Sequence, residues 1–308
     1  MSELRFDGQV AIVTGAGGSP GLGRSYAHLL AERGAKVVVN DLGVGPDGRG
    51  ITLAHADRVA QEIVDAGGEA VADTNSVAEA ASARAIVQTA LDTWGRVDIL
   101  INNAGVCPMA EFDVISEDDI EKIINVHTFG NVWMCRAVWP HMKAQGYGRI
   151  VNITSGAMFG LRYVVLYGTA KGGVFGLTRG LAVEGQQHGI KVNTVGPAAG
   201  TVAITHLNVE TEWMKVMDDL KPEQVAPAVA YLAHADCAVS GKYLEAAGGR
   251  VAEKFTGETQ GFYKADLTIE DVRDNLEQIL DRTDFTPLAD LGIMPDDGSI
   301  VPKPYQPA

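Results

Sequence analysis

The sequence has little positive charge and no long apolar run. It carries 25 Lys and Arg against 39 Asp and Glu, which gives a net charge of −14 at pH 7. Nucleic-acid binding depends on clustered cations that neutralise phosphates, so this balance argues against a nucleic-acid partner. No stretch reaches the ~18 apolar residues that span a bilayer. The opening MSELRFDGQV lacks a basic segment followed by an apolar one. We therefore expect no membrane partner and a cytoplasmic location.

Cysteine is scarce and histidine is dispersed. The three cysteines, Cys107, Cys135 and Cys237, form no CxxC pair, and the seven histidines form no HxxxH or HExxH pair. We therefore expect neither a disulfide framework nor a metal site. Hydrophobic residues, in contrast, make up 46% of the 308 positions, enough for the core of one enzyme-sized unit.

Short β-branched runs alternate with longer amphipathic segments. QVAIVT and KVVVN flank a helix predicted at about 21–33, and a second helix is predicted near 53–66. Further strands are predicted at EAVAD, VDILIN, RIVNI, KVNTV and KYLEA, with helices between them such as 78–94 and 130–144. This order predicts an α/β fold with a Rossmann-type, doubly wound parallel sheet of about seven strands and helices on both faces.

The composition changes after residue 249. TIEDVRDNLEQIL has helical spacing and opens with a threonine, whereas the last residues, PDDGSIVPKPYQPA, are irregular. We predict one domain over residues 1–249 and a C-terminal helical extension over 250–308. The extension is expected to pack on the same unit or on a partner subunit.

A glycine-rich turn, VTGAGGSPGLGRSYA, joins the first predicted strand to the first helix. A strand, glycine turn and helix present backbone N–H groups and a positive helix end to a phosphate. A triphosphate loop needs lysine where Arg24 stands, whereas a dinucleotide site needs a carboxylate about 20 residues on, after the second strand. Asp41 is that carboxylate. It would accept hydrogen bonds from the adenosine ribose and repel a 2′-phosphate, so we predict NAD as the cofactor.

A tyrosine and a lysine stand four residues apart in YGTAK, which places Tyr167 and Lys171 on one helix face. A tyrosine that acts as a base near neutral pH needs its pKa lowered by about 3 units. A nearby ammonium and the positive charge of an oxidised nicotinamide could supply that shift. Upstream, GRIVNITSG ends at Ser155, a candidate to hydrogen-bond the substrate oxygen, with Thr154 as the competitor.

Together with INNAG at 101–105 and NTVGP at 193–197, these motifs make the sequence resemble the short-chain dehydrogenase/reductase family over about residues 6–248. Within the family, the resemblance is to the (3R)-hydroxyacyl-CoA dehydrogenase units of type 2 peroxisomal multifunctional enzymes, also called 17β-hydroxysteroid dehydrogenase type 4. It rests on LRFDGQV, RGAKVVVNDLG, NVHTFGN and LKPEQVAP.

The resemblance implies site residues. The implied cofactor-binding residues are Gly15, Gly21, Leu22 and Gly23 at the pyrophosphate, Asp41 at the adenosine ribose, Asn75 at the adenine, Asn103, Ala104 and Gly105 on the adenosine side, Pro197 at the nicotinamide, and Tyr167 and Lys171. The implied catalytic residues are Ser155, which orients the alcohol, Tyr167, which removes its proton, Lys171, which lowers the tyrosine pKa, and His127.

The sequence departs from the family pattern in four places. Ser19 and Pro20 are inserted in the glycine turn, and the spacing from Ser155 to Tyr167 is one residue shorter than usual. His127 stands where many members carry a catalytic Asn, as it does in the multifunctional enzymes. Asn75 replaces an Asp that usually meets the adenine. The insertion affects how the turn binds the pyrophosphate, the shorter spacing affects the path of the loop over the substrate, and His127 affects the proton relay.

Apolar residues near Tyr167 suit an acyl chain or a steroid, although core packing explains them equally well. They are Met158, Phe159, Leu161, Tyr163 and residues 202–207. Arg162, Lys242 and Arg250 are candidates to meet the phosphates of coenzyme A.

The predicted function is an NAD-dependent oxidoreductase that interconverts a secondary alcohol and a ketone. The favoured substrate is a 3-hydroxyacyl-CoA with a fatty or steroid side chain. The alternatives are a free hydroxysteroid or another secondary alcohol and, from another class, a cofactor-sensing protein without catalysis. Glycines in KGGVFGLTRG, on the face that meets another subunit in the family, predict a homodimer or homotetramer.

Overall fold

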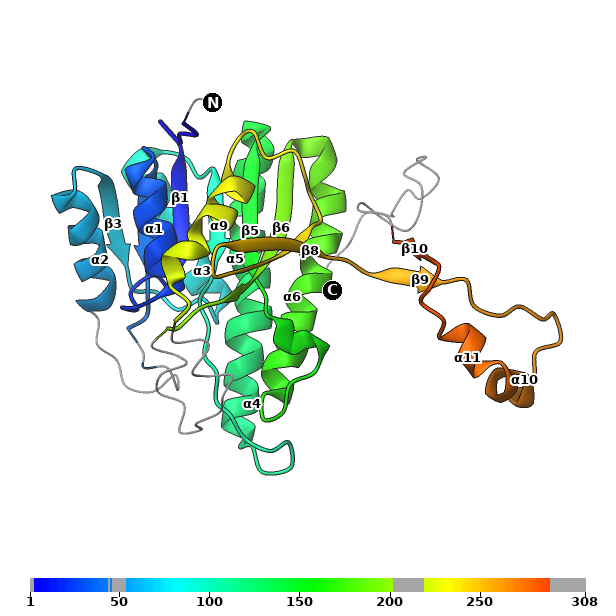
Figure 1. The fold of residues 1–308 in the computed structure, drawn as a ribbon. Helices are drawn as coiled ribbons and strands as arrows, with labels where there is room; N and C mark the ends of the chain where they lie inside the picture. The colour runs from blue at the N-terminus through cyan, green and yellow to red at the C-terminus, as the bar shows by residue number, and fades with distance from the viewer. Residues whose placement is uncertain (1–2, 44, 46–53, 202–218, 289–308) are drawn as a thin grey trace, which may run out of the picture.

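The computed structural model describes residues 3–43, 45, 54–201 and 219–288, and its centre is an eight-stranded sheet (Figure 1). The strand order is β3-β2-β1-β4-β5-β6-β7-β8. The strands are β1 (Val10–Thr14), β2 (Lys36–Asn40), β3 (Glu69–Asp73), β4 (Ile99–Asn102), β5 (Gly148–Ile153), β6 (Ile190–Ala198), β7 (Tyr243–Ala247) and β8 (Arg250–Lys254). The first seven are parallel, which confirms the predicted sheet.

The eighth strand was not predicted and runs antiparallel to β7. The reversal takes place at Gly248 and Gly249, whose φ angles are +55° and +80°. Glycine adopts such angles without the steric cost that a side chain brings, so this pair allows the tight turn.

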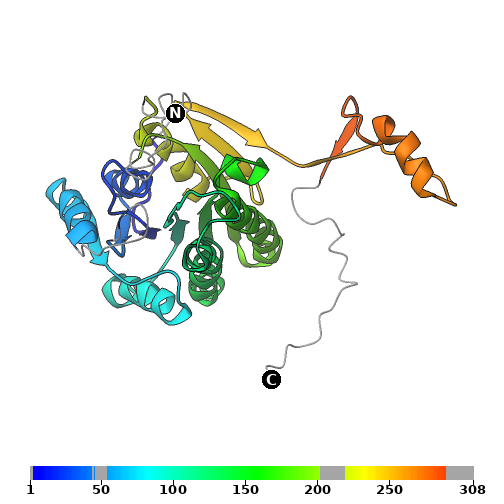
Figure 2. The same ribbon diagram turned by 90° about the horizontal axis from the view of Figure 1, so that it is seen from below.

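Helices cover both faces of the sheet, as Figure 2 shows in the view along the strands. They are α1 (Leu22–Glu32), α2 (Ala54–Asp65), α3 (Ala80–Trp94), α4 (Glu117–Ile123), the π-helical segment η1 (Ile124–Phe129), α5 (Gly130–Gln145), α6 (Val165–Gly185) and α9 (Ala226–Ala233). The four helices predicted from the sequence lie within two residues of their expected bounds.

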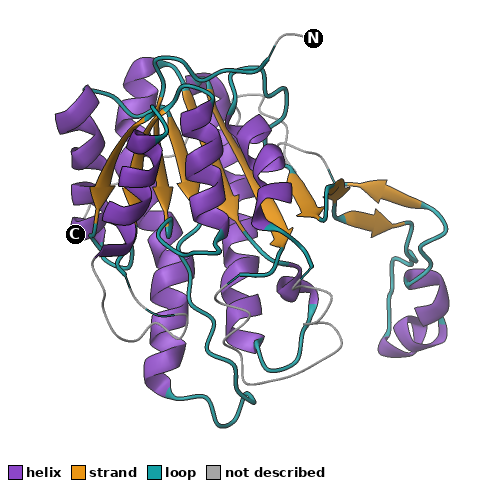
Figure 3. Ribbon diagram, turned by 60° about the vertical axis from the view of Figure 1, so that its left-hand side comes forward, coloured by secondary structure: helices purple, strands orange, loops and turns teal. Residues whose placement is uncertain are grey.

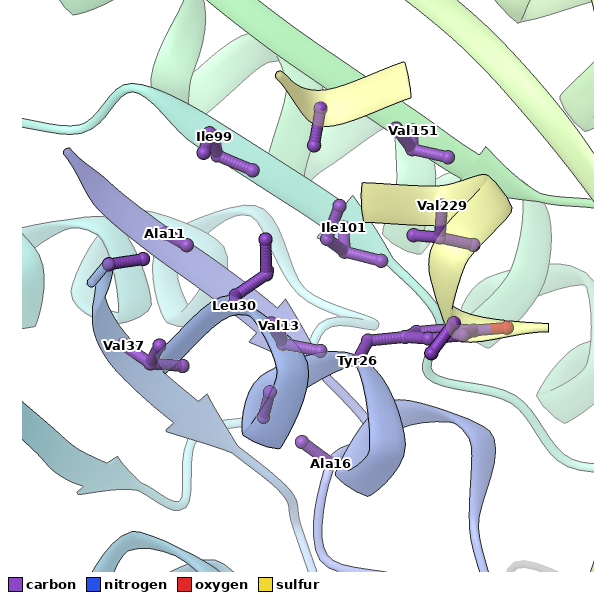
Figure 4. Close-up of a cluster of buried hydrophobic side chains, with 14 of the residues drawn as sticks. Ala11, Val13, Ala16, Tyr26, Leu30, Val37, Ile99, Ile101, Val151 and Val229 are labelled. Carbon is purple, nitrogen blue, oxygen red and sulfur yellow. The ribbon is translucent and has the colours of Figure 1, made fainter. Parts of the chain in front are cut away.

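Two hydrophobic cores result, one on each face. In the first, Leu30 of α1 and Val229 of α9 pack on strand residues such as Ile101 and Val151 (Figure 4). In the second, α3, α5 and α6 cover the opposite face through residues such as Ile86, Val138 and Ala182. Fully burying one such aliphatic side chain contributes roughly 1.5–3 kcal/mol, so strands buried on both faces hold the sheet rigidly.

The strand order places a topological switch between β1 and β4, which are neighbours although β2 and β3 intervene in the sequence. In open α/β sheets ligands bind outside the carboxyl ends of the strands at such a switch. The glycine turn after β1 and residues 103–105 after β4 both lie at this point.

Residues 250–254 of the predicted C-terminal extension belong to the sheet as β8, and its described remainder, residues 255–288, stands apart from the sheet and its helices (Figure 1, Figure 3). It contains the antiparallel pair β9 (Gly257–Thr259) and β10 (Phe285–Pro287) and the short helices α10 (Ile269–Asp274) and α11 (Leu276–Ile279). Thr268 and Asp271 form a capping box at the start of α10, where the sequence predicted a helix. We call residues 255–288 the arm. Within the described part of the chain, no helix is long and apolar enough to cross a membrane.

Candidate active site

The glycine turn is closed by backbone contacts that leave no room for side chains. A Cβ on Gly15 would lie 2.7 Å from the Cα of Ala104, and a Cβ on Gly21 would lie 2.5 Å from the carbonyl oxygen of Gly18. A Cβ on Gly23 would overlap the carbonyl oxygen of Gly15. A backbone cradle of this kind, at the N-terminus of α1, fits a dinucleotide pyrophosphate.

The inserted residues Ser19 and Pro20 are exposed. Because Gly18 and Gly21 remain in contact at the base of the insertion, the extra length projects outward and leaves the turn closed. Leu22 opens α1 beyond the insertion and packs against the core as a partly buried residue.

Asn103, Ala104 and Gly105 hold the turn from the end of β4. The Nδ2 of Asn103 donates to the carbonyl oxygens of Thr14 and Gly15 at 2.9 Å each. The backbone N–H groups of Asn103 and Ala104 donate to the Thr14 hydroxyl, at 3.0 and 3.1 Å. These residues therefore shape the turn, in addition to the adenosine contact that the resemblance implies.

Asp41 follows β2 directly, at the same edge of the sheet. Its carboxylate accepts hydrogen bonds from the backbone N–H groups of Gly17 and Gly43, both at 2.7 Å. The carboxylate is thereby fixed beside the glycine turn, where it can also accept hydrogen bonds from ribose hydroxyls.

Asn75 lies near the carboxyl ends of β2 and β3 in a network that the sequence analysis missed. Its Nδ2 donates to Asp73 at 3.0 Å, and its carbonyl oxygen accepts from Asn40 at 2.9 Å. Asp73 also accepts from Thr89 at 2.8 Å. The position of Asp73 at the end of a strand, at the same edge as Asp41, is the signal that could have found it.

Ser155, Tyr167 and Lys171 converge beyond the end of β5. The Ser155 hydroxyl caps the short helix η2 (Gly156–Phe159) by accepting from the N–H of Ala157 at 3.2 Å, and it is hydrogen-bonded to Tyr167. The Lys171 ammonium lies 5.5 Å from the centroid of the Tyr167 ring and donates to the Ile153 carbonyl at 2.6 Å. The spacing of tyrosine and lysine on α6 therefore does bring both groups to one place.

Thr154, the alternative to Ser155, has another task. Its buried hydroxyl donates to the carbonyl oxygen of Lys171 at 3.0 Å and so joins β5 to α6. This hydrogen bond faces the core, whereas the Ser155 hydroxyl faces Tyr167.

Burial shifts the two titrating groups toward their neutral forms. It lowers the pKa of Lys171 to about 7, and it raises the pKa of Tyr167 well above its ordinary value, with a further upward contribution from Cys107. The hydrogen bond from Ser155 opposes the latter shift. In the protein alone, burial therefore keeps Tyr167 in its neutral form, and the role expected for Lys171 stays a prediction. The positive charge of an oxidised nicotinamide remains as the source that the sequence analysis named.

His127 is buried in η1, beside Tyr167. The two rings meet edge to face with centroids 5.0 Å apart, and Nε2 of His127 lies 2.7 Å from the Val106 carbonyl oxygen. Gly105 permits this arrangement, because a Cβ there would overlap the imidazole. Burial, with a further contribution from Lys171, lowers the pKa of His127 well below its ordinary value, so the ring is neutral. Among the described residues its Nδ1 has no hydrogen-bond partner.

Pro197 lies near the end of β6, opposite Ala246 of β7. Its neighbour Gly196 packs against the Tyr243 phenol, whose oxygen is buried and has no partner within the described structure. Pro197 thus reaches the same edge as Ser155, since Ile153 of β5 pairs with Val195.

The structure describes some of the predicted substrate residues and not others. Phe159 at the end of η2 and Leu161 and Tyr163 after it are exposed, and Met158 is partly buried, which distinguishes this loop from core packing. Residues 202–207 lie outside the described residues. A groove of about 320 Å³ lies elsewhere, between α3 and α5, and none of the predicted site residues lines it.

Of the three candidate basic residues, Lys242 and Arg250 do not lie together. Lys242 is paired with Glu253 at 2.9 Å, and it lies at the opposite end of the β7–β8 hairpin from Arg250. Arg162 stacks over Tyr163. The cation that does approach the loop is Lys254, which the sequence analysis missed: its ammonium lies 5.3 Å from the Phe159 ring centroid and pairs with Glu245.

The chain is similar to known proteins over most of its length. The family model described as short chain dehydrogenase matches residues 9–213. Peroxisomal multifunctional enzyme type 2 of Mus musculus is 42% identical over 285 residues, which cover 91% of this chain but 38% of that protein.

Two solved structures match with a TM-score of 0.75 and 35% identity. One is a crystal structure of a short chain dehydrogenase from Mycobacterium avium, and the match covers 89% of this chain and 95% of that chain. The other is the structure of full-length peroxisomal multifunctional enzyme type 2 from Drosophila melanogaster, and the match covers 93% of this chain and 48% of that chain. The chain thus spans less than half the length of these two type 2 multifunctional enzymes.

Proposed function

The chain belongs to the short-chain dehydrogenase family, and on that premise we propose that it is an NAD-dependent enzyme that interconverts a secondary alcohol and a ketone. The observation that carries this proposal is the convergence of Ser155, Tyr167 and Lys171 at the edge of the sheet that also holds the glycine turn. Acid–base groups and a phosphate cradle at one switch point are what a dehydrogenase requires.

The catalytic roles follow from the contacts. A bound nicotinamide supplies the hydride acceptor or donor. The hydroxyls of Ser155 and Tyr167, already hydrogen-bonded to each other, can both reach one substrate oxygen, so Ser155 orients it while Tyr167 takes or returns its proton. The ammonium of Lys171 lies beside the Tyr167 ring and stabilises the tyrosinate. Neutral His127 packs edge to face against the ring of Tyr167.

The preference for NAD over NADP is proposed from Asp41. Its carboxylate is a fixed acceptor beside the turn and would repel a 2′-phosphate. No arginine or lysine stands in its place at the end of β2.

The substrate class that we propose is a 3-hydroxyacyl-CoA. The resemblance to the dehydrogenase unit of multifunctional enzymes and the 42% identity to the mouse protein support it, as does the exposed apolar loop at 159–163. A free hydroxysteroid or other secondary alcohol is the second candidate, and cofactor sensing without catalysis is the third.

One set of assays separates these candidates. Purified protein is supplied with NAD and with 3-hydroxyacyl-CoA thioesters of graded chain length, steroid side-chain thioesters or free hydroxysteroids, and NADH formation is followed. We expect turnover of thioesters and its loss in Tyr167→Phe. Turnover of free hydroxysteroids alone would favour the second candidate. NADH binding without turnover of any alcohol would favour the third.

We also propose a homo-oligomer. Gly172, Gly176 and Gly180 lie four residues apart on α6, and a Cβ on any of them would meet no atom beyond its own helix within 4 Å. Such a stripe allows a second helix to pack closely, and the arm carries exposed apolar side chains that a partner subunit could cover. The cytoplasmic location stays a prediction, since the two multifunctional enzymes named above are called peroxisomal.

A further inference from the structure

Three basic side chains surround one carboxylate between α1 and α2. The Oε2 of Glu62 lies 2.8 Å from Nε of Arg24 and 3.0 Å from Nε2 of His28. Its Oε1 lies 3.8 Å from Nε of Arg58. Glu62 is therefore the common partner of basic side chains that come from two helices.

This cluster reaches the cofactor turn through Arg58. The Nη2 of Arg58 donates to the carbonyl oxygen of Gly17 at 2.7 Å, while the N–H of the same Gly17 donates to Asp41 at 2.7 Å. One residue of the turn thus separates Arg58 from the carboxylate proposed to meet the adenosine ribose. The positive charge of Arg58, and the charges of the groups that pair with it, therefore affect the electrostatic potential at the ribose end of the site.

Glu62 is the carboxylate that pairs with both guanidinium groups, Arg24 and Arg58. Partial burial raises the pKa of Glu62, but the hydrogen bonds from His28 and Arg24 lower it overall, so the carboxylate is ionised at neutral pH. Without Glu62, Arg24 and Arg58 would lose the carboxylate that they share, and Arg58 would keep its contact with the turn at Gly17. Arginine beside the adenosine ribose is what accommodates a 2′-phosphate.

We propose that Glu62 is a specificity-determining positioning residue, which holds Arg24 and Arg58 in ion pairs and so keeps the ribose end of the cofactor site selective against a 2′-phosphate. The inference rests on the proposed function, because it presupposes that a dinucleotide binds at the glycine turn. It goes beyond the role of Asp41, since Glu62 belongs to another helix and acts through the arginines.

The test compares the affinities of NADH and NADPH by fluorescence titration, which reads binding without turnover. In wild-type protein NADH is expected to bind more tightly than NADPH. In Glu62→Gln the ratio of the two dissociation constants should shift toward NADPH by about fivefold or more at low salt, and by less at high salt, since the effect is one of charge.

The matched control is Glu69→Gln. Glu69 pairs with Lys36 at 3.2 Å, at the amino ends of β3 and β2, away from the cofactor edge. This variant removes the same charge from the chain and should leave the ratio unchanged. A purely structural role for Glu62 would weaken the binding of both dinucleotides equally, independent of salt.

Two further variants identify the route. Arg58→Met in the Glu62→Gln background should abolish the gain in NADPH affinity. Arg24→Met in otherwise wild-type protein leaves Glu62 less neutralised and should shift the ratio the other way, which keeps the proposal testable if Glu62→Gln folds poorly.

The outcomes separate the two proposals. If wild-type protein binds neither dinucleotide, the proposed function fails and this inference fails with it. If it binds NADH but folded Glu62→Gln, or in its place Arg24→Met, leaves the ratio unchanged, the role of Glu62 is wrong and the proposed function stands.

Discussion

At the scale of single residues, burial shifts the protonation of the candidate catalytic residues Tyr167 and Lys171. The surroundings that raise the pKa of Tyr167 also lower that of Lys171, because a charge loses its hydration in an apolar environment. The resting pair in the protein alone is therefore close to neutral. We expect a cationic ligand to be needed before Tyr167 can lose its proton near neutral pH.

The lysine shift predicts how stability changes with pH. Burial lowers the pKa of Lys171 from 10.5 to about 7 in the native state. Between these values the unfolded chain binds more protons than the native one, so the free energy of unfolding should rise with pH. Relative to Lys171→Met, we expect wild-type protein to gain about 2 kcal/mol between pH 7 and pH 9, measured by urea unfolding.

Taking the difference between the two proteins cancels the titration of groups that they share. A constant difference over this pH range would mean that Lys171 keeps an ordinary pKa in the native state and that its burial is incomplete.

A second prediction concerns the contact between Gly105 and His127. A methyl group at Gly105 would overlap the imidazole, so Gly105→Ala should cost about 1–3 kcal/mol of stability and displace His127 from Tyr167. The additional change His127→Ala removes the overlap, and the double variant should recover much of that stability, as a double-mutant cycle by thermal unfolding can measure. Additive losses would show that the two residues do not compete for space.

At the scale of elements, η1 and α6 deliver the side chains that surround the catalytic tyrosine. The π-helical turn of η1 lies between α4 and α5 and contains His127, while α6 supplies both Tyr167 and Lys171. π-Helical turns are rare and occur frequently at functional sites, which agrees with the position of this one.

The glycine stripe on α6 predicts the outcome of adding bulk. Gly176→Leu meets open space in the single chain, so the fold should persist, but a closely packed second copy would be pushed away. We expect a shift toward the monomer in sedimentation velocity. Ala81→Leu, which places the same side chain on an exposed position of α3, is the control and should leave the mass unchanged. An unchanged mass in both variants would rule out this face as the interface.

The elements that could be predicted are those with a strong local pattern. KVVVN and VDILIN could be predicted as strands because both of their faces are buried, so that each reads as a short continuous apolar run. The strand β8 escaped prediction because RVAEK is short and largely polar, and its pairing depends on the turn at 248–249. A π turn leaves no periodic signal, so η1 was not predicted either.

The candidate site shows the same division. Ser155, Tyr167 and Lys171 could be placed together because a strand end and a helix face fix their directions. The direction of the tyrosine pKa shift could not be predicted, since it depends on apolar neighbours from several elements. The clusters around Glu62 and Asp73 depend on contacts between elements and also required the structure.

At the scale of the whole molecule, the arm is the part whose apolar surface is least covered. Tyr263 is 88% exposed and Ile269 is 82% exposed, beside other apolar residues along α10 and α11. Exposed apolar surface of this kind marks interaction sites in soluble domains. The arm is therefore suited to contact a second copy of the chain.

Ile269→Glu should weaken that contact, because it places a charge on the apolar face of α10. We expect the dissociation constant of self-association, from sedimentation equilibrium, to rise about tenfold, which corresponds to the loss of one well-packed contact. Val64→Glu makes a similar change at an exposed position on α2 and is the matched control. Equal behaviour of both variants and wild type would mean that the arm does not join subunits.

The central position of β1 in the sheet has a consequence for the order in which the chain folds. β1 pairs with β2 on one side, a neighbour in sequence, and with β4 on the other, whose pairing must close a loop of many residues. Non-local pairings of this kind form slowly, because the entropy of loop closure is lost before contacts compensate for it. The contact between the glycine turn and Asn103 should accordingly form late during refolding, and a dinucleotide added at the start should bind the chain only after β4 has docked.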